Sequence, residues 1–259
     1  MQQQNDDRIV PPNIFGHNRA VVTSQYAIMQ TAGTLPSRIP GISGATLRVQ
    51  TAPPMGAEFA QILCELEPGG GTEYDRLEDG IQHFFYVLDG EVDLTIDGQI
   101  FSLTAHGYGY VPVNHRCGFS ARTDARMIWI RKPYEPLDIP APDPLISHRD
   151  SVERSRPHTE GRYWQYLLPT DDFAFDMSMN ILGFKPGNYF PYVETHIMEH
   201  GLFMLEGQGL YLLAGDWHEA VVDDFIWMAP YCPQQFYCTG WGEAAYLLYK
   251  NVNRDIRFA

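Results

Sequence analysis

Short apolar runs separated by turn residues dominate the chain from about residue 45 onwards. Each run is rich in β-branched or aromatic side chains and is bounded by Gly, Pro, Asp or Asn. Such runs predict β-strands, and almost no stretch repeats with the period of an α-helix. In the first half we predict strands at Glu58–Leu66, Phe84–Leu88, Glu91–Ile96, Tyr108–Val113 and Arg126–Arg131. Short strands at this spacing are typical of a β-sandwich or a small barrel.

Two Asp-Gly pairs separate neighbouring apolar runs of the first half, at Asp89-Gly90 and at Asp97-Gly98. An Asp-Gly pair between apolar runs is a strong signal for a β-hairpin, because both residues tolerate positive φ. The sequence therefore predicts two consecutive hairpins.

The second half repeats the pattern of the first. We predict strands there at Asp176–Phe184, His200–Leu205, Gly209–Leu213, Asp224–Met228 and Ala244–Tyr249. Residues 85–92 (FYVLDGEV) match residues 202–209 (LFMLEGQG), and 109–112 (GYVP) match 226–230 (IWMAP). An internal duplication explains these matches better than chance does.

Five prolines between residues 133 and 144 mark the boundary between the two halves, because proline cannot donate to a β-ladder. We divide the chain into an N-terminal arm (1–44), a first domain (45–132), a proline-rich linker (133–160) and a second domain (161–259).

Composition agrees with a globular, turn-rich protein. Hydrophobic residues make up 44% of the chain, and it contains 23 Gly and 19 Pro. The formal net charge of −14 repels phosphate backbones and anionic lipids, so we expect neither nucleic acid nor membrane as a partner. The four cysteines form no C-x-x-C pair, and we expect them to be free thiols, mostly packed. The polar, acidic start lacks the features of a secretory signal, which predicts a cytoplasmic location.

Three potential metal ligands lie within seven residues of the second half: Glu194, His196 and His200. Glu194 and His196 are two residues apart, so on a strand they point to the same side, and a tight turn could return His200 beside them. A carboxylate and two imidazoles on one side form the outline of a metal site.

This spacing resembles the first motif of the cupin superfamily, with Glu194 in place of the usual His and His200 in place of the usual Glu. The segment that corresponds to the second cupin motif, Asp224 to Gln235, contains no His. An amide oxygen of Gln234 or Gln235 must therefore replace the usual imidazole. The resemblance implies an all-β bicupin, two tandem jelly-roll barrels.

The set of Glu, His, His and Gln is unusual among cupins and resembles the (S)-ureidoglycine aminohydrolases, manganese-binding bicupins of allantoin breakdown. The likeness is strongest from about residue 173 to residue 258. It implies that the metal ligands are Glu194, His196, His200 and Gln234, since Gln234 directly follows Pro233 as in that family. The generic cupin register would select Gln235 instead.

The same resemblance implies that Tyr246, Lys250 and, less directly, Tyr211 contact the substrate, together with Glu194 and Gln234. Tyr246 and Lys250 are four residues apart on a predicted strand, about 13 Å along it, and their long side chains can converge on one ligand. Two oxygen donors and two imidazoles, without a thiolate, suit Mn²⁺, although such a set also admits Zn²⁺ or Fe²⁺.

The implied reaction is hydrolysis of (S)-ureidoglycine to (S)-ureidoglycolate and ammonia, with Lys250 or Glu194 as proton carrier. The substrate is a small anion, so local positive charge from the metal, Lys250 or Arg254 must outweigh the acidic chain. Two rival functions are an iron-dependent cupin oxygenase and a non-catalytic ligand-binding bicupin. We further expect a homo-oligomer, since bicupins commonly assemble.

The first half offers fewer ligands at its corresponding positions. They hold Leu77, Asp79, His83 and Cys117, with no second imidazole, so we expect this domain to bind no metal. His106 and His115 receive no role. We expect Glu199 and Glu206, in the second half, to lie on solvent-facing turns.

Overall fold

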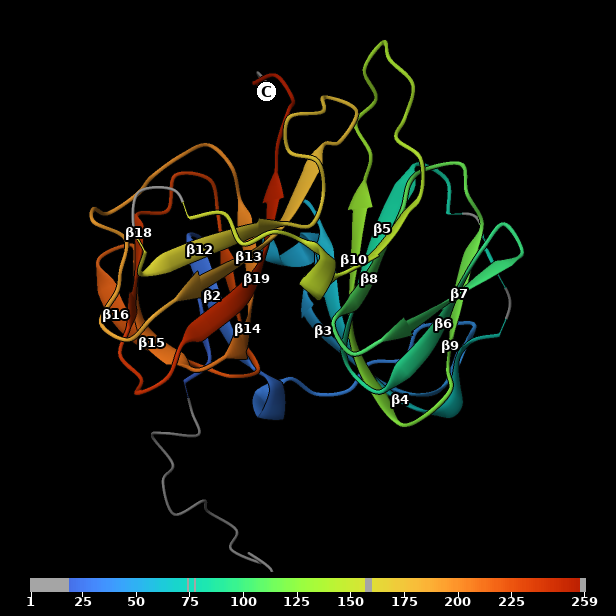
Figure 1. The fold of residues 1–259 in the computed structure, drawn as a ribbon, viewed down its shortest axis with the longest axis horizontal. Helices are drawn as coiled ribbons and strands as arrows, with labels where there is room; N and C mark the ends of the chain where they lie inside the picture. The colour runs from blue at the N-terminus through green and yellow to red at the C-terminus, as the bar shows by residue number, and fades with distance from the viewer. Residues whose placement is uncertain (1–18, 74, 77, 157–159, 257–259) are drawn as a thin grey trace, which may run out of the picture.

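The computed structural model describes residues 19–73, 75–76, 78–156 and 160–256, and Figure 1 shows that their regular secondary structure is almost entirely β-strand. The all-β prediction is confirmed. Within the described residues, helix is limited to three short 3-10 turns, η1 (Thr31–Gly33), η2 (Pro53–Met55) and η3 (Arg149–Ser151), and none could cross a membrane. All four cysteines are buried free thiols, as predicted.

The first half forms a nine-stranded sheet that curls into a barrel. Its strand order is β11-β8-β5-β10-β4-β9-β6-β7, and β3 pairs with β4 outside this path. The strands are β3 (Ile42–Thr51), β4 (Ala60–Thr72), β5 (Ile81–Asp89), β6 (Glu91–Ile96), β7 (Gln99–Thr104), β8 (Gly107–Val111), β9 (Cys117–Ala121), β10 (Ala125–Pro133) and β11 (Leu145–His148).

The second half forms a barrel from two sheets, with strand orders β1-β2-β17-β14-β19-β13-β12 and β16-β15-β18. Its strands are β1 (Val21–Val22), β2 (Tyr26–Gln30), β12 (Arg162–Tyr166), β13 (Met177–Phe184), β14 (His200–Glu206), β15 (Gln208–Leu213), β16 (Asp216–Val221), β17 (Asp224–Met228), β18 (Gln234–Cys238) and β19 (Ala244–Asn251).

The two halves share one topology. The order β8-β5-β10-β4-β3 of the first half recurs as β17-β14-β19-β13-β12 in the second. The register also recurs, because His83 of β5 lies opposite Arg131 of β10, and His200 of β14 lies opposite Lys250 of β19. This agreement supports the internal duplication inferred from the repeated phrases.

The strand that precedes each half pairs with an outer strand of the other barrel. Strand β2, from the expected N-terminal arm, pairs with β17 of the second barrel, and β11, from the expected linker, pairs with β8 of the first. The arm and the linker therefore complete the barrels, while the domain limits themselves stay a prediction.

One of the two predicted hairpins is wrong. Strands β6 and β7 pair through the turn at Asp97 and Gly98, which both have positive φ, as predicted. Strands β5 and β6 do not pair with each other, because β5 joins β8 and β10 while β6 joins β7 and β9. The Asp89-Gly90 turn instead carries the chain from one face of the barrel to the other.

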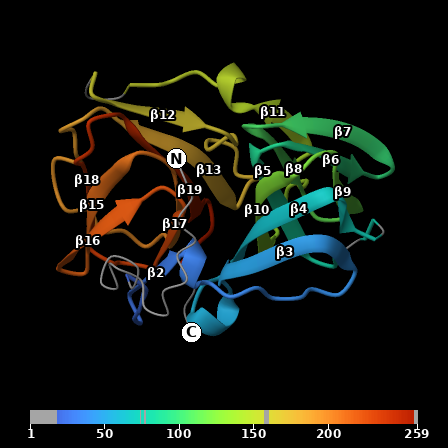
Figure 2. The same cartoon turned by 90° about the horizontal axis from the view of Figure 1, so that it is seen from below.

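A shared core joins the two halves, which Figures 1 and 2 show side by side. Each barrel has its own apolar interior, and a third cluster between them contains buried aromatic side chains of both halves. Phe59 and Phe84 come from the first half, and Phe203 and Tyr249 from the second. Full burial of each such ring contributes about 1.5–3 kcal/mol. The two halves consequently pack as one unit.

Candidate active site

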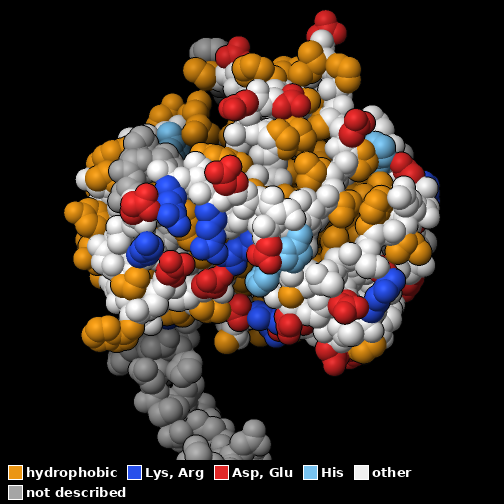
Figure 3. Space-filling view, viewed as in Figure 1, with side chains coloured by type: hydrophobic (Ala, Val, Ile, Leu, Met, Phe, Trp, Pro, Cys, Tyr) orange, Lys and Arg blue, Asp and Glu red, His pale blue; other side chains and the backbone are white. Residues whose placement is uncertain are grey.

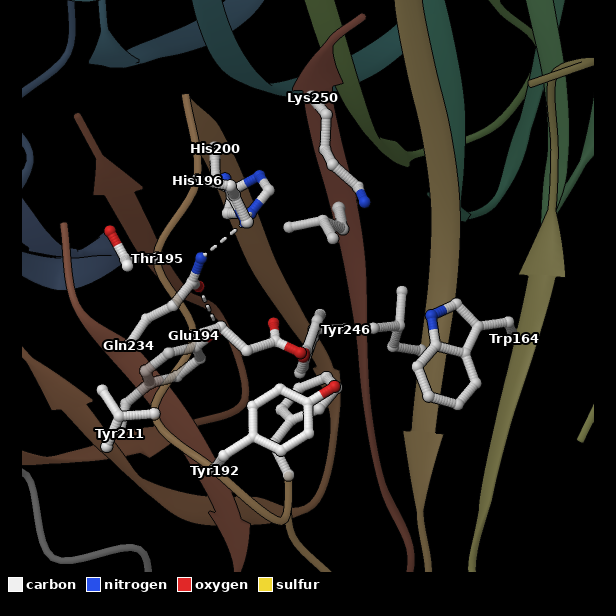
Figure 4. A pocket seen from close by; sticks show the side chains of 14 residues that line it. Trp164, Tyr192, Glu194, Thr195, His196, His200, Tyr211, Gln234, Tyr246 and Lys250 are labelled. Carbon is white, nitrogen blue, oxygen red and sulfur yellow. Dashed lines mark hydrogen bonds between the residues drawn. The ribbon is translucent and has the colours of Figure 1, made fainter. Parts of the chain in front are cut away.

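A cavity of about 510 Å³ opens into the barrel of the second half. All seven side chains that sequence analysis assigned to the site line it, namely Glu194, His196, His200, Tyr211, Gln234, Tyr246 and Lys250. Figure 4 shows them arriving from different strands and from the loop before β14. The fold thus brings together residues that are up to 56 positions apart in the chain.

Two imidazoles meet in this cavity. The Nε2 atoms of His196 and His200 are 3.0 Å apart, and their rings are nearly perpendicular. His200 begins β14, while His196 precedes it in a loop whose backbone pairs with the start of β18: Glu194 and Gln234 exchange two backbone hydrogen bonds of 2.8 and 2.9 Å. This pairing fixes the loop against the barrel wall.

Both histidines are held in the neutral form, which metal ligation requires. Burial lowers the pKa of His200 well below its ordinary value, and the nearby charge of Lys250 lowers it further. The pKa of His196 is lowered by the same two causes. Nδ1 of His196 lies 3.1 Å from the carbonyl oxygen of Met198, so Nδ1 carries the proton and Nε2 keeps its lone pair for a ligand.

Gln234, and not Gln235, points into the cavity. The Gln234 amide lies 3.1 Å from Nε2 of His196, and it also accepts a hydrogen bond from the Tyr211 hydroxyl at 3.2 Å. The two ends of an amide are exchanged by a half-turn of the group, so its oxygen can face the imidazoles equally well. The side chain of Gln235 donates instead to the Phe190 carbonyl.

Glu194 lines the same cavity, but its carboxylate is turned away from the imidazoles toward Tyr192 (Figure 4). Within the described ranges, no three His, Cys, Asp or Glu side chains come close enough together to hold a metal. Burial raises the pKa of Glu194, and Lys250 and Arg162 partly oppose this shift. The structure therefore gathers three of the four predicted ligands and places the fourth on the wall beside them.

The observed donors fit a divalent ion. Two neutral imidazoles and one amide converge on one point, and a carboxylate is available from the adjacent wall. Nδ1 of His200 is buried and makes no hydrogen bond in the part of the chain that the structure describes. Nitrogen and oxygen donors without a thiolate suit Mn²⁺ and ions of similar hardness.

Lys250 and Tyr246 lie on the same face of β19 and both line the cavity. Burial lowers the pKa of Lys250, and Glu194 partly opposes this change. No hydrogen bond or ion pair holds the Lys250 ammonium among the described residues. Burial raises the pKa of Tyr246 and of Tyr211, so both phenols keep their protons and can donate hydrogen bonds.

Arg162 is a candidate site residue that sequence reasoning missed. It lies on β12, is 7% exposed, and its guanidinium lies over the rings of Trp164 and Phe190, which line the cavity. Strand β12 was not among the predicted strands, although Arg162 and Trp164 alternate as residues on one face of a strand do. The positive charge of Arg162 acts on two residues of the cavity, because it opposes the rise in the pKa of Glu194 and of Tyr246.

Arg254, by contrast, lies outside this cavity. Its guanidinium donates to the carbonyl oxygens of Glu135 and Phe173 and lies over the ring of Tyr134. It lines a separate cavity of about 410 Å³ between the two halves. Arg254 is therefore not the source of local charge that sequence analysis considered.

The expectation that Glu199 is solvent-facing is wrong. Its side chain is 1% exposed, and burial raises its pKa to about 7. The error arises because its partners, Glu58, Trp227 and Tyr249, are all distant in the sequence. Glu206 does lie on an exposed turn, where it pairs with Arg149 at 2.5 Å.

At the corresponding position of the first half, charged side chains pair with one another. His83 takes the place of His200, and its Nδ1 accepts from the indole of Trp129 at 3.2 Å. Glu78 forms a close ion pair with Arg131. Cys117 is buried at the start of β9, and Asp79 is exposed. Leu77 lies outside the described residues, and the absence of metal from this half stays a prediction.

Comparisons with known proteins agree with this picture. A family model for the cupin domain matches residues 62–131. The (S)-ureidoglycine aminohydrolase of Escherichia coli K12 is 33% identical over 245 residues, covering 92% of this chain and 93% of the relative. An (S)-ureidoglycine aminohydrolase of Arabidopsis thaliana is 27% identical over 241 residues, covering 93% and 80%.

Two solved structures resemble the whole chain. Protein Ylba from E. coli superposes with a TM-score of 0.86 at 29% identity, covering 96% of this chain and 100% of that one. A putative glyoxylate-induced protein from Pseudomonas aeruginosa gives a TM-score of 0.85 at 33% identity, covering 93% and 94%.

Proposed function

This chain belongs to the (S)-ureidoglycine aminohydrolase family, and on that premise we propose that its second barrel hydrolyses (S)-ureidoglycine with the help of one bound divalent ion, Mn²⁺. The chain is a bicupin, and the convergence of His196, His200 and Gln234 in the cavity of the second half is the observation that supports this location. Glu194 would complete the ligand set from the cavity wall.

The reaction replaces one bond at a single carbon. The Cα–N bond to the amino group breaks, a Cα–O bond to water forms, and the proton lost by water balances the one gained by the departing ammonia. When bound, the ion would supply positive charge that neutralises the substrate carboxylate and fixes its orientation. The side chains of the cavity must supply the rest.

We assign the proton carrier to Lys250. Burial lowers the pKa of Lys250 below its ordinary value, which makes loss of its proton easier. It lines the cavity, and no partner among the described residues occupies its ammonium. Glu194 has the opposite shift, but its proposed role as a ligand leaves its carboxylate less free to carry a proton.

The remaining side chains would orient the substrate and keep water out. Tyr211 and Tyr246 are nearly fully buried and present hydroxyls to a small polar ligand. The rings of Trp164 and Phe190 form an apolar wall, and the guanidinium of Arg162 lies over both rings. A cavity with an apolar wall and a few convergent polar groups is what a small-molecule site requires.

The direct test is ammonia release from freshly generated (S)-ureidoglycine, compared with the spontaneous rate. Chelated protein should match the background, and restoring Mn²⁺ should accelerate release and give (S)-ureidoglycolate. Acceleration that is unaffected by chelation would contradict the metal-dependent proposal. Oxygen consumption, or metal binding without turnover, would support the oxygenase or the non-catalytic binder instead.

A further inference from the structure

Glu199 is a buried carboxylate that none of the steps above uses. It receives hydrogen bonds from the backbone N–H of Glu58 at 3.1 and 3.2 Å and from the indole N–H of Trp227 at 3.1 Å. The hydroxyl of Tyr249 also donates to the Glu199 carboxylate, at 3.4 Å. Burial of a carboxylate costs free energy unless hydrogen bonds satisfy it. These hydrogen bonds are therefore needed to keep Glu199 in its buried position.

These contacts surround the backbone of His200. Glu199 directly precedes it, and the Glu199 backbone N–H donates to the side chain of Asn251 at 2.8 Å. Gly201 directly follows it and lies against Phe59. A Cβ at Gly201 would lie only 2.4 Å from the Phe59 ring, so a glycine is required for that ring to fit. His200 is therefore fixed on both sides.

On each side of His200, one of these contacts comes from the first half of the chain. Glu58 and Phe59 precede β4. The Phe59 ring is fully buried and lies tilted against the ring of Tyr249 on β19, with the ring centroids 4.0 Å apart. We call the contacts of Glu58 and Phe59 with Glu199 and Gly201 the interdomain clamp. It connects the first barrel directly to a proposed ligand of the second.

The second half makes a corresponding contact with the first. Asp176, immediately before β13, is fully buried and accepts from Gln82, the residue before His83. It also pairs with Lys132 at 2.6 Å and accepts from the backbone N–H of Glu135 at 2.8 Å. This contact lies beside His83, which has no second imidazole next to it. It therefore serves as a control for the contact of Glu199 beside His200.

We propose that the interdomain clamp positions His200 and thereby sets the metal affinity of the second barrel, which makes the first barrel a support for the site. The inference rests on the proposed function, because it assumes that His200 binds the ion. Glu199 is thus a positioning residue that acts through its neighbour. Groups that orient metal ligands typically contribute 10- to 100-fold to metal affinity.

The test compares Glu199→Gln with Asp176→Asn in the full-length protein. The first substitution keeps the size of the side chain but places an amide where only acceptors fit, and the second makes the equivalent change in the control contact. Calorimetric titration of each chelated protein with Mn²⁺ gives the Kd, and thermal unfolding gives the Tm. Phe59→Leu loosens the same clamp by another route and serves if Glu199→Gln does not fold.

We expect Glu199→Gln to raise the Kd for Mn²⁺ about tenfold, and Asp176→Asn to leave it within a factor of two while lowering the Tm. If Glu199→Gln and Phe59→Leu both bind Mn²⁺ with the Kd of the wild type, the proposed role of the clamp is wrong, while the proposed function is unaffected. An equal rise in Kd for Asp176→Asn would also overturn that role, because affinity would then follow general stability. Absence of Mn²⁺ binding by the wild type would overturn both proposals.

Discussion

Lys250 lines the cavity of a chain whose net charge is −14, and Arg162 acts on Glu194 and Tyr246 in the same cavity. Figure 3 shows acidic, basic and hydrophobic side chains interspersed over one face of the molecule, so the overall charge does not predict the field inside a particular pocket. The two residues differ in position. Lys250 lines the cavity, whereas the guanidinium of Arg162 lies over two rings that line it.

This difference predicts different kinetic effects when each charge is removed. Lys250→Met should lower kcat at least 100-fold with metal content unchanged, because proton transfer by a positioned group contributes about 10²–10⁴-fold.

Arg162→Gln should mainly raise KM for (S)-ureidoglycine, by about tenfold, because it weakens the local field that attracts the anion. Steady-state kinetics together with metal analysis separates the two effects. Full activity of the Lys250→Met variant would show that Lys250 is not the proton carrier.

His83 gives the first half a defined dependence of stability on pH. Burial lowers its pKa from the usual 6.5 to about 4, with the charges of Arg131 and Arg76 contributing and Glu78 opposing. Between these pH values the unfolded chain binds more protons than the folded chain, so stability is complete above pH 6.5 and falls as the pH decreases toward 4. At 1.36 kcal/mol per pKa unit the loss is about 3 kcal/mol.

Urea unfolding at a series of pH values tests this assignment. The wild type should lose this stability below pH 6.5, and His83→Gln, which does not titrate, should show a correspondingly shallower decline. Equal slopes for the two proteins would show that the decline has another origin.

The proposed ligands could be predicted from the sequence because they lie close together in it. Glu194, His196 and His200 fall within seven residues, and Gln234 follows a recognisable Pro-rich turn. Glu199 and Arg162 could not be predicted in the same way. Their environments depend on strands that are remote in the chain, so only the folded structure shows that they are buried.

At the level of elements, the turns that end β5 and β14 explain why the repeated phrases contain a glycine. Gly90 and Gly207 both have positive φ, and a Cβ at either would lie 2.2–2.3 Å from a backbone oxygen of the opposite turn. Each glycine therefore serves two needs, an unusual backbone conformation and a close approach. This is why the Asp89-Gly90 pair mimics a hairpin signal without forming one.

Gly207→Ala should accordingly cost far more than Gly187→Ala. Both residues have positive φ, but nothing lies within 4 Å of a Cβ at Gly187. We expect about 1 kcal/mol for Gly187→Ala, from the left-handed conformation alone, and at least 3 kcal/mol for Gly207→Ala, because the backbone must also move. Equal midpoints in urea unfolding would show that the close approach costs little.

Strands were predicted well where both sides of the strand are apolar, as in β5, β14 and β19. Strands β7, β16 and β18 were missed because their outward residues are polar or exposed and the apolar run is interrupted. The pairing of β2 with β17 joins residues about 200 positions apart, and local patterns carry no information about such contacts.

At the scale of the whole molecule, the duplication has produced two barrels with one topology and different chemistry. The second barrel gathers two imidazoles and an amide around a cavity, whereas the first pairs Glu78 with Arg131 beside a single imidazole. The shared core and the exchanged edge strands make the halves structurally interdependent. Assembly into a homo-oligomer stays a prediction.

The central claim is that catalysis belongs to the second barrel and depends on its histidines. The matched pair His200→Gln and His83→Gln tests it most directly, because the two residues occupy equivalent register positions. The measurement is Mn²⁺-dependent ammonia release from (S)-ureidoglycine by each folded variant. We predict that His200→Gln falls to the spontaneous rate while His83→Gln keeps most of the wild-type rate. Loss of activity in His83→Gln with retention in His200→Gln would contradict the account.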